Sequence, residues 1–213
     1  RFDTPAVRTA VKNGLWSDRE EVVADSARMA GDTNLMLGSD RREVGARLVE
    51  LTAHNHERIR EESVWTLRHR AAEFLAPHLA RLCQDRLEGV RRACAEAMGE
   101  LRTPDQTKLL AGLAYDKESS VRWAALKALG DPTFREAIPS LVPLLKNPEH
   151  QYNDPCMWAI ANAGGPEAAA VLVQEIREGN TCGGTMFAAL EKVTGRAFRT
   201  AEEAMAWWWT FPL

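Results

Sequence analysis

Four side chains that share one place in a repeated pattern are the strongest candidates for binding chemistry in this chain. Each lies two residues after a core position of a predicted helix, and the four are Glu61, Arg92, Trp123 and Trp158. On a helix this position lies about 200° from the core residue, so these side chains should point away from the core. Exposed tryptophans beside an arginine supply the contacts that dominate measured interface energies. The pattern therefore predicts a surface for a protein or peptide, anchored by the two tryptophans.

A second set of candidates lies one helical turn further along the same predicted helices. Its members are Trp65, Glu96, Lys127 and Asn162. In this prediction Arg92, Lys127 and Glu61 set the polarity and register of a bound chain, beside the tryptophan anchors. The alternative that remains open is that the tryptophans fold back onto neighbouring helices.

The elements that must position these side chains recur every 31 residues. The dipeptides Ile59-Arg60, Val90-Arg91 and Val121-Arg122 mark the repeat, and the residues four and eight positions after each valine or isoleucine are again small or apolar. Self-similarity with a period of 20–50 residues is the signature of stacked repeats. In such arrays each unit covers the apolar face of its neighbour.

Each unit is predicted to be a pair of antiparallel helices. In the clearest unit, a first helix over residues 73–84 and a second helix over residues 89–101 flank a polar turn. The apolar residues of the second helix follow helical spacing, which places them on one face. They are Val90, Cys94, Ala97, Met98 and Leu101. The next unit repeats this scheme, with looser units on both sides of the regular ones.

These patterns predict an all-α fold, a right-handed α-solenoid of about five to six helical hairpins. We expect residues 1–213 to form a single domain. Residues 1–40 would hold degenerate N-terminal units, residues 41–195 the repeat array and residues 196–213 a C-terminal cap.

The predicted cap contains three consecutive tryptophans. Thr200 and Glu203 have the spacing of a capping box, which predicts a helix start at this point. The helix would then carry Trp207, Trp208 and Trp209. Consecutive residues lie about 100° apart on a helix, so the three rings cannot all face inward. They either cover the last repeat or form a docking site for a partner.

The charge balance disfavours nucleic acid as the partner. The chain has 27 lysines and arginines against 30 aspartates and glutamates, a net charge of −3. Nucleic-acid binders usually carry a basic excess, because phosphate neutralisation dominates their affinity. Arginines do gather between residues 58 and 92, but acidic residues alternate with them. A mixed pattern of this kind is typical of a solvated face with intrahelical ion pairs.

The cysteines and histidines predict no metal or cofactor site. Cys83, Cys94, Cys156 and Cys182 lack CxxC spacing, which favours reduced thiols in an intracellular protein, although a bridge between Cys156 and Cys182 stays open. The histidines show no ligand spacing. No apolar run suits a membrane helix. The chain begins without methionine, so we expect a trimmed N-terminus. From the cysteines we expect a cytoplasmic location.

Residues 85–99 and 116–130 closely resemble the short HEAT-like repeats of bacteria and archaea, the type also found in phycobilisome lyases. The closing segment from Leu190 through the tryptophan run is similar to the end of many such proteins, so the resemblance covers about residues 40–209. It implies a structural ladder between units, made by the aspartate before each second helix and the arginine after each valine. The matching residues are Asp85, Asp116, Arg60, Arg91 and Arg122. His54 replaces the ladder aspartate at the first regular unit, where we expect the link to be weaker.

The resemblance implies a fold more strongly than a function, because the family includes scaffolds, enzyme-associated subunits and lyases. HEAT-like DNA glycosylases need a carboxylate among aromatic side chains, and Glu61 near Trp65 is the one pairing of this kind. No serine or cysteine nucleophile has an identifiable base. We therefore predict a non-enzymatic scaffold that binds a protein or peptide on its concave face. The alternatives are a nucleic-acid-binding protein and an accessory subunit for attaching a cofactor to another protein.

Overall fold

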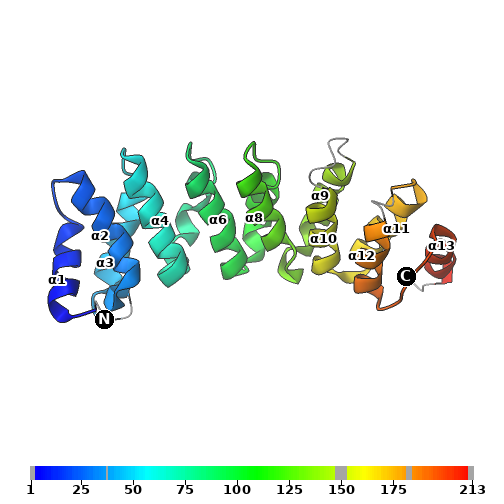
Figure 1. The fold of residues 1–213 in the computed structure, drawn as a ribbon, viewed down its shortest axis with the longest axis horizontal. Coiled ribbons are helices and arrows are strands. Elements are labelled where there is room, and N and C mark those ends of the chain that lie inside the picture. Colours follow the sequence, from blue (N-terminus) through cyan, green and yellow to red (C-terminus); the bar gives the residue numbers. More distant parts are fainter. Residues whose placement is uncertain (1–2, 37, 147–152, 181–183, 211–213) are drawn as a thin grey trace. The chain divides into compact units, whose positions relative to one another are not determined.

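All regular secondary structure in the computed structural model is helical. The structure describes residues 3–36, 38–146, 153–180 and 184–210, and within these ranges it contains no strand. The helices follow one another as hairpins, and a single further helix closes the described chain (Figure 1). The predicted all-α repeat fold is confirmed, and the right-handedness of the array stays a prediction.

The chain divides into two compact units, Arg1–Leu101 and Arg102–Leu213. The α-helices of the first unit are α1 (Pro5–Gly14), α2 (Glu20–Asp32), α3 (Arg41–Leu51), α4 (Glu57–Ala71), α5 (Leu79–Leu82) and α6 (Glu88–Leu101). They form three hairpins, which pair α1 with α2, α3 with α4, and α5 with α6. Short 3₁₀ turns accompany them: η1 (Asn34–Met36), η2 (Ala72–Phe74) and η3 (Ala76–His78). That residues 1–213 form one domain stays a prediction.

The second unit repeats the same scheme and ends in the closing helix. Its α-helices are α7 (Thr107–Leu113), α8 (Ser119–Leu129), α9 (Ile138–Leu145), α10 (Asn153–Ala163), α11 (Gly165–Arg177), α12 (Thr185–Thr194) and α13 (Ala201–Thr210). The 3₁₀ turns η4 (Pro104–Gln106) and η5 (Pro132–Ala137) lead into α7 and α9. The described part of the chain thus holds six hairpins, the upper end of the predicted number.

Within each unit the second helices of successive hairpins pack side by side. In the first unit α4 lies between α2 and α6, and in the second unit α10 lies between α8 and α12 (Figure 1). Each second helix also packs on the first helix of its own hairpin. In each hairpin, the apolar face of the second helix is therefore covered by the first helix and by the second helix of a neighbouring hairpin, as expected for stacked repeats.

The core follows the predicted periodicity with two departures. Val90, Cys94, Ala97 and Met98 are fully buried in α6, whereas Leu101 is half-buried because it is the last residue of that helix. The corresponding core residues of α8 are Val121, Ala125 and Leu129, and its Ala128 is half-buried. Among the described residues, the largest fully buried side chain is Phe134 in η5.

The continuous helix predicted over residues 73–84 is wrong. The chain leaves helical geometry at Ala71, forms η2 and η3, and then makes only the four residues of α5. Pro77 explains the break, because proline has no N–H to donate and its ring clashes with the carbonyl group four residues earlier. The first helix of this hairpin is therefore a series of short turns that still buries Leu75, Leu79 and Leu82.

The predicted capping box at the last helix is present. The Glu203 backbone N–H donates to the Thr200 hydroxyl oxygen at 3.2 Å. The Glu203 carboxylate accepts from the backbone N–H of Arg199 at 2.8 Å, one residue earlier than in the usual box. These two bonds satisfy two backbone N–H groups at the start of α13.

Replacing Phe134 by alanine is expected to destabilise the second unit by about 3–5 kcal/mol, because it leaves a cavity in a close-packed core. Urea denaturation followed by circular dichroism measures the loss. The control is Trp209→Ala, which removes an aromatic ring that is 78% exposed and should change stability by less than about 0.5 kcal/mol. A similar small change for Phe134→Ala would contradict its place in the core.

Candidate functional site

Trp123 and Trp158 lie on adjacent second helices of the second unit. Trp123 is on α8 and is 59% exposed, so its ring does not fold back into the core. Trp158 is on α10 and is half-buried. The two helices pack against each other, which brings the tryptophan-bearing faces together.

A groove with a volume of about 300 Å³ lies between these two helices. Both tryptophans line it, together with Lys127 and Asn162 from the second predicted set. Its other lining residues are Leu126, Asp154, Pro155 and Ala159. All of them belong to the second unit, so the groove is complete within residues 102–213.

The polar groups of the groove are few and differ in charge. The Lys127 ammonium nitrogen lies 5.7 Å from the ring centroid of Trp123, within the range of a cation–π contact. Asp154 is exposed near the start of α10 and accepts a hydrogen bond from the Thr185 hydroxyl at 3.3 Å. Asn162 is exposed, and its Cβ would lie 3.1 Å from a Cβ placed on Gly130. The groove therefore offers two aromatic faces, one cation, one carboxylate and one amide.

The remaining predicted binding residues lie in the first unit and do not line this groove. Glu61 and Arg92 are exposed, whereas Glu96 is half-buried and pairs with Arg68 at 3.3 Å. Trp65 is 39% exposed, and its ring centroid is 4.3 Å from that of His69.

Trp65 leans toward α2. Its ring edge would lie 3.2 Å from a Cβ placed on Gly31. The Glu61 carboxylate instead lies against Gly89 at the start of α6, where a Cβ would meet its oxygen at 2.1 Å. Because the two side chains extend toward opposite neighbouring helices, they do not form a pocket of a carboxylate among aromatic rings.

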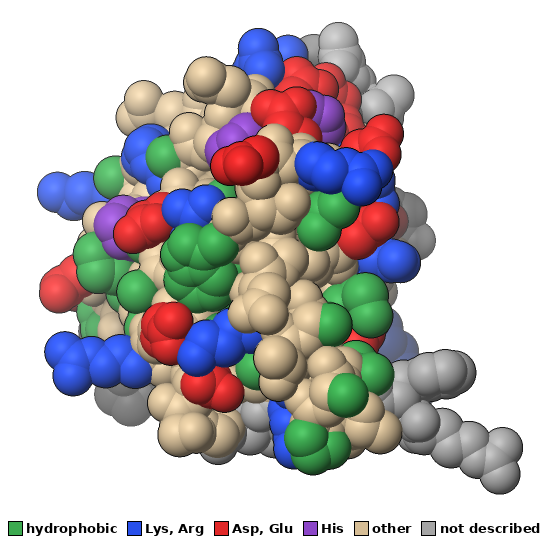
Figure 2. Space-filling model, turned by 90° about the vertical axis from the view of Figure 1, so that its left-hand side faces the viewer, with side chains coloured by type: hydrophobic (Ala, Val, Ile, Leu, Met, Phe, Trp, Pro, Cys, Tyr) green, Lys and Arg blue, Asp and Glu red, His purple; other side chains and the backbone are tan. Residues whose placement is uncertain are grey.

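The arginines between residues 58 and 92 are largely engaged with partners inside the first unit. Arg58 pairs with Asp25 at 2.6 Å, and Arg68 also pairs with Glu100 at 2.8 Å. Arg70 donates to the Gly31 carbonyl oxygen at 2.6 Å. Figure 2 shows acidic and basic side chains interspersed over the N-terminal end of the molecule. These contacts make the segment a mixed, solvated face rather than a basic stripe.

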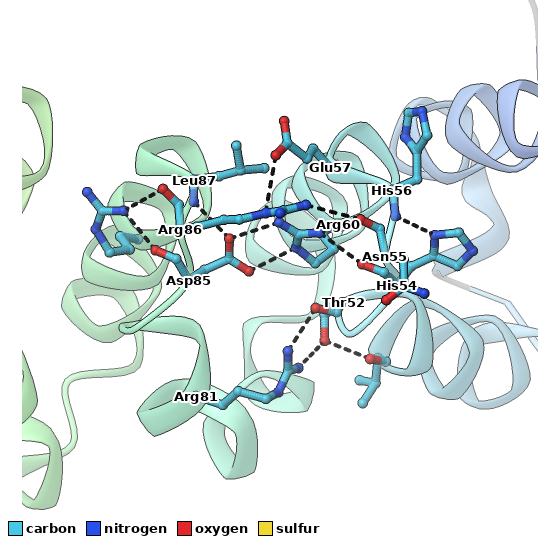
Figure 3. Close-up of polar contacts among 12 residues, drawn as sticks. Thr52, His54, Asn55, His56, Glu57, Arg60, Arg81, Asp85, Arg86 and Leu87 are labelled. Carbon is cyan, nitrogen blue, oxygen red and sulfur yellow. Dashed lines mark hydrogen bonds and ion pairs between the residues drawn. The ribbon is translucent and has the colours of Figure 1, made fainter.

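The best-buried ion pair in the first unit joins successive hairpins (Figure 3). Arg60 Nε donates to Asp85 Oδ2 at 2.9 Å and Arg60 Nη2 donates to Asp85 Oδ1 at 3.2 Å. The two side chains are 8% and 9% exposed. This bidentate geometry is the strong form of an arginine–carboxylate contact. It links α4 to the turn before α6.

The same arginines also close the turns of their own hairpins. Nη1 of Arg60 donates to the carbonyl oxygens of His54 and Asn55, at 2.9 and 3.0 Å. Arg91 makes the equivalent bonds to Asp85 and Arg86, at 2.7 and 3.1 Å. Arg122 repeats them in the second unit, on the carbonyl oxygens of Asp116 and Lys117. Each arginine thus holds the two carbonyl groups five and six residues before it.

His54 keeps one of the two contacts that an aspartate makes at this place. Its Nδ1 accepts from the backbone N–H of His56 at 3.0 Å, as Asp85 Oδ1 accepts from Leu87 and Asp116 Oδ1 from Glu118, both at 2.9 Å. The position that corresponds to the ladder arginine in α2 is Val23, which is buried. The histidine therefore shapes the turn without an arginine at the matching position of the preceding hairpin.

A second hollow of about 210 Å³ lies beside the closing helix. It is lined by Ala170, Val173, Gln174 and Arg177 of α11 and by Met205, Trp208 and Trp209 of α13. The ring centroids of Trp207 and Phe198 are 5.4 Å apart, and α13 packs on α11. Trp207 and Trp208 are half-buried, whereas Trp209 is 78% exposed. The helix covers the last hairpin and still presents one tryptophan to solvent.

The described residues form neither a metal-binding cluster nor a helix suited to span a membrane. Within the described ranges, no three histidine, cysteine, aspartate or glutamate side chains gather in a way that could hold a metal ion. In the same part of the chain, no helix is long and apolar enough to cross a membrane. Cys182, which belonged to the possible bridge with Cys156, lies outside the described residues.

Comparison with known proteins places the repeats in a family. The family model described as HEAT repeats matches residues 44–130 and 107–181 of the sequence. The chain belongs to the HEAT repeat family. A search of curated proteins found no match for it. The finer relation to bacterial and archaeal repeats, or to phycobilisome lyases, stays a prediction.

Solved structures with a similar fold include designed repeat proteins. A designed armadillo repeat protein in complex with the peptide (KR)4 is 20% identical and has a TM-score of 0.60, with 96% of this chain and 99% of that chain covered. Another designed armadillo repeat protein is 19% identical and has a TM-score of 0.59, with 93% and 97% covered. The E. coli protein YIBA is 15% identical and has a TM-score of 0.63, with 87% and 68% covered. At these identities the likeness concerns the fold alone.

Four of the residues that line the groove of this HEAT repeat protein were not among the predicted binding residues. Asp154 and Pro155 precede Trp158 by four and three positions, and Leu126 follows Trp123 by three. Residues three and four apart share one face of a helix. Applying that spacing around each tryptophan would have found them. Ala159, the fourth, directly follows Trp158 and carries no comparable signal.

Asp85→Asn is expected to destabilise the first unit by about 3 kcal/mol, because it removes one charge of a buried pair and leaves the Arg60 guanidinium without its counter-ion. Urea denaturation measures the change. The matched control is Glu57→Gln, which breaks the exposed pair with Arg86 across the same two hairpins. That control should cost no more than about 0.5 kcal/mol. Equal effects of the two variants would show that burial of the Arg60–Asp85 pair does not matter.

Proposed function

We propose that this HEAT repeat protein binds an extended segment of another protein, with one apolar side chain of that segment held between Trp123 and Trp158. The observation that carries the proposal is the groove between α8 and α10, which both tryptophans line. Its volume of about 300 Å³ is at the small end of ligand sites, and suits one or two side chains better than a large cofactor.

The energetics of the groove favour a peptide over a polar ligand. Tryptophan is enriched among the residues that dominate interface energies, because it buries a large area at a low cost in conformational entropy. Lys127 and Asp154 stand among the lining residues and can pair with charges that flank the buried side chain. With one charge of each sign, the groove would orient a peptide rather than select a uniformly charged one.

The fold of the solved neighbours supports this proposal. One of them is a designed armadillo repeat protein in complex with a peptide, so a fold of this type can present a peptide-binding surface. We extend the proposal to the equivalent outward positions of the first unit, Glu61, Trp65, Arg92 and Glu96, which would contact flanking parts of the partner.

The observations favour nucleic acid less than a peptide as the partner. The arginines between residues 58 and 92 are largely paired with carboxylates or with backbone carbonyl groups of the first unit. Glu61 and Trp65 extend toward different helices. No observation favours attachment of a cofactor to another protein.

Trp123→Ala is expected to weaken binding of a selected peptide by roughly 30-fold, the effect of losing about 2 kcal/mol at an interface hot spot. Peptides are first selected from a random display library against the wild-type protein. Their dissociation constants are then measured by isothermal titration calorimetry, and Trp158→Ala should weaken them to a similar extent.

The control for this experiment is Trp209→Ala, which removes an exposed tryptophan outside the groove. It should leave the affinity unchanged, and circular dichroism shows whether each variant remains folded. Selection of peptides that bind folded Trp123→Ala and Trp158→Ala as tightly as wild type would overturn the proposed groove.

The affinity for such a peptide is expected to depend weakly on salt, because stacking and apolar burial contribute most of it. A change of less than about tenfold between low and physiological salt would agree with this, whereas duplex DNA held by several phosphate contacts loses about 10³–10⁵-fold. Fluorescence anisotropy with a labelled peptide and a labelled duplex measures both. Tight binding of the duplex, lost steeply with salt, would favour the nucleic-acid alternative.

A further inference from the structure

Two of the cysteines lie side by side within one hairpin of the first unit. The Cys83 and Cys94 sulfur atoms are 3.0 Å apart, with Cys83 directly after α5 and Cys94 within α6. Cys83 is half-buried and Cys94 is fully buried. Both are thiols in this structure. The sulfur atoms of a disulfide are about 2.05 Å apart, so the pair would need to approach by only about 1 Å.

We propose that Cys83 and Cys94 form a reversible disulfide within the hairpin when the folded protein meets a small disulfide oxidant such as oxidised glutathione. The pair is a redox-sensitive modification site that is independent of the proposed peptide groove, which lies in the other unit.

The burial of the two thiols determines the order of the exchange. Cys83 is the partly accessible one, so its thiolate attacks the oxidant, forms a mixed disulfide and releases one glutathione thiolate. Cys94 stays protonated at this stage, since its hydrogen bond to Cys83 and its burial raise its pKa far above the ordinary value.

The second step completes the balance of atoms and electrons. Once Cys83 is in the mixed disulfide, its charge no longer raises the pKa of Cys94, and burial still does. Cys94 loses its proton and attacks the Cys83 sulfur, which expels the second glutathione thiolate, and the two glutathione thiolates take up from water the two protons that Cys83 and Cys94 released. Two protein thiols thereby lose two electrons and two protons, and one molecule of oxidised glutathione becomes two of the reduced form.

Cys156 provides an internal contrast. Its sulfur donates to the Leu141 carbonyl oxygen at 3.2 Å. Burial, together with the nearby charge of Glu175, raises the pKa of this thiol to about 12. Because the thiolate is the reactive form, Cys156 should remain reduced under conditions that oxidise the pair.

The proposed bond would close the turn that the arginine contacts already hold. The segment between the two cysteines contains Asp85 and Arg86, whose carbonyl groups accept from Arg91. It also carries the carboxylate that pairs with Arg60. A disulfide stabilises mainly by restricting the unfolded chain, and a bridge across this segment keeps the turn close to its folded geometry.

Peptide mapping of the wild-type protein tests the bond directly. The folded protein is equilibrated with oxidised glutathione, the remaining thiols are blocked with iodoacetamide, and the protein is digested with trypsin without reduction. Cleavage after Arg81, Arg86, Arg92 and Arg102 separates the peptide Leu82–Arg86 from the peptide Ala93–Arg102. Mass spectrometry should find these two peptides joined, and dithiothreitol should separate them. Cys156 should be recovered without a disulfide.

A stability measurement shows whether the bond forms in the native geometry. The variant Cys156→Ser/Cys182→Ser leaves only the proposed pair, and its oxidised form should melt several degrees above its reduced form. Adding Cys83→Ser should abolish that difference. A mixed disulfide with glutathione at Cys83 as the sole product, joined peptides only after urea treatment, or an oxidised form that melts lower would each overturn the proposal. The peptide map of the wild type decides the question even if a variant fails to fold.

Discussion

A helical hairpin of this length cannot bury its apolar face by itself, so each unit depends on a neighbour held at a fixed register. The arginine after each core valine or isoleucine serves this constraint. Its planar guanidinium has five donors, and Arg60 uses them on two carbonyl groups of its own turn and on the carboxylate of the next turn. This contact joins α4 to the turn from which α6 begins.

A buried ion pair of this kind is not in itself evidence of high stability, because desolvation of both charges offsets much of their attraction. Its contribution here is better understood as geometric. The carbonyl contacts recur at Arg60, Arg91 and Arg122 in both units. They leave the turn with one favoured shape, and the second helix begins from it. Where α2 has Val23 in place of the arginine, the turn of the next hairpin is held by His54 and by the carbonyl contacts of Arg60, which belongs to the same hairpin as His54.

The register between successive second helices also explains how a binding groove arises without any special loop. When second helices stack in parallel, a side chain two residues after the core position has a counterpart on the next helix. In the second unit those counterparts are Trp123 and Trp158, and the space between α8 and α10 becomes an aromatic groove. In the first unit the same positions carry Glu61 and Arg92, so that surface is polar. The chemistry of each surface is thus determined by a few outward residues on a common scaffold.

The sequence by itself determined the repeat period, the helical hairpins, the core face of α6 and the outward direction of Trp123, because helical periodicity depends on local spacing alone. Only the tertiary structure decided which neighbours each side chain meets. Trp65 leans over Gly31, Asp154 and Pro155 join the tryptophans, and Pro77 reduces the expected helix over residues 73–84 to short turns. The 3.0 Å approach of Cys83 to Cys94 likewise depends on how α5 packs on α6. These outcomes follow from packing between helices, which the periodicity of one helix does not specify.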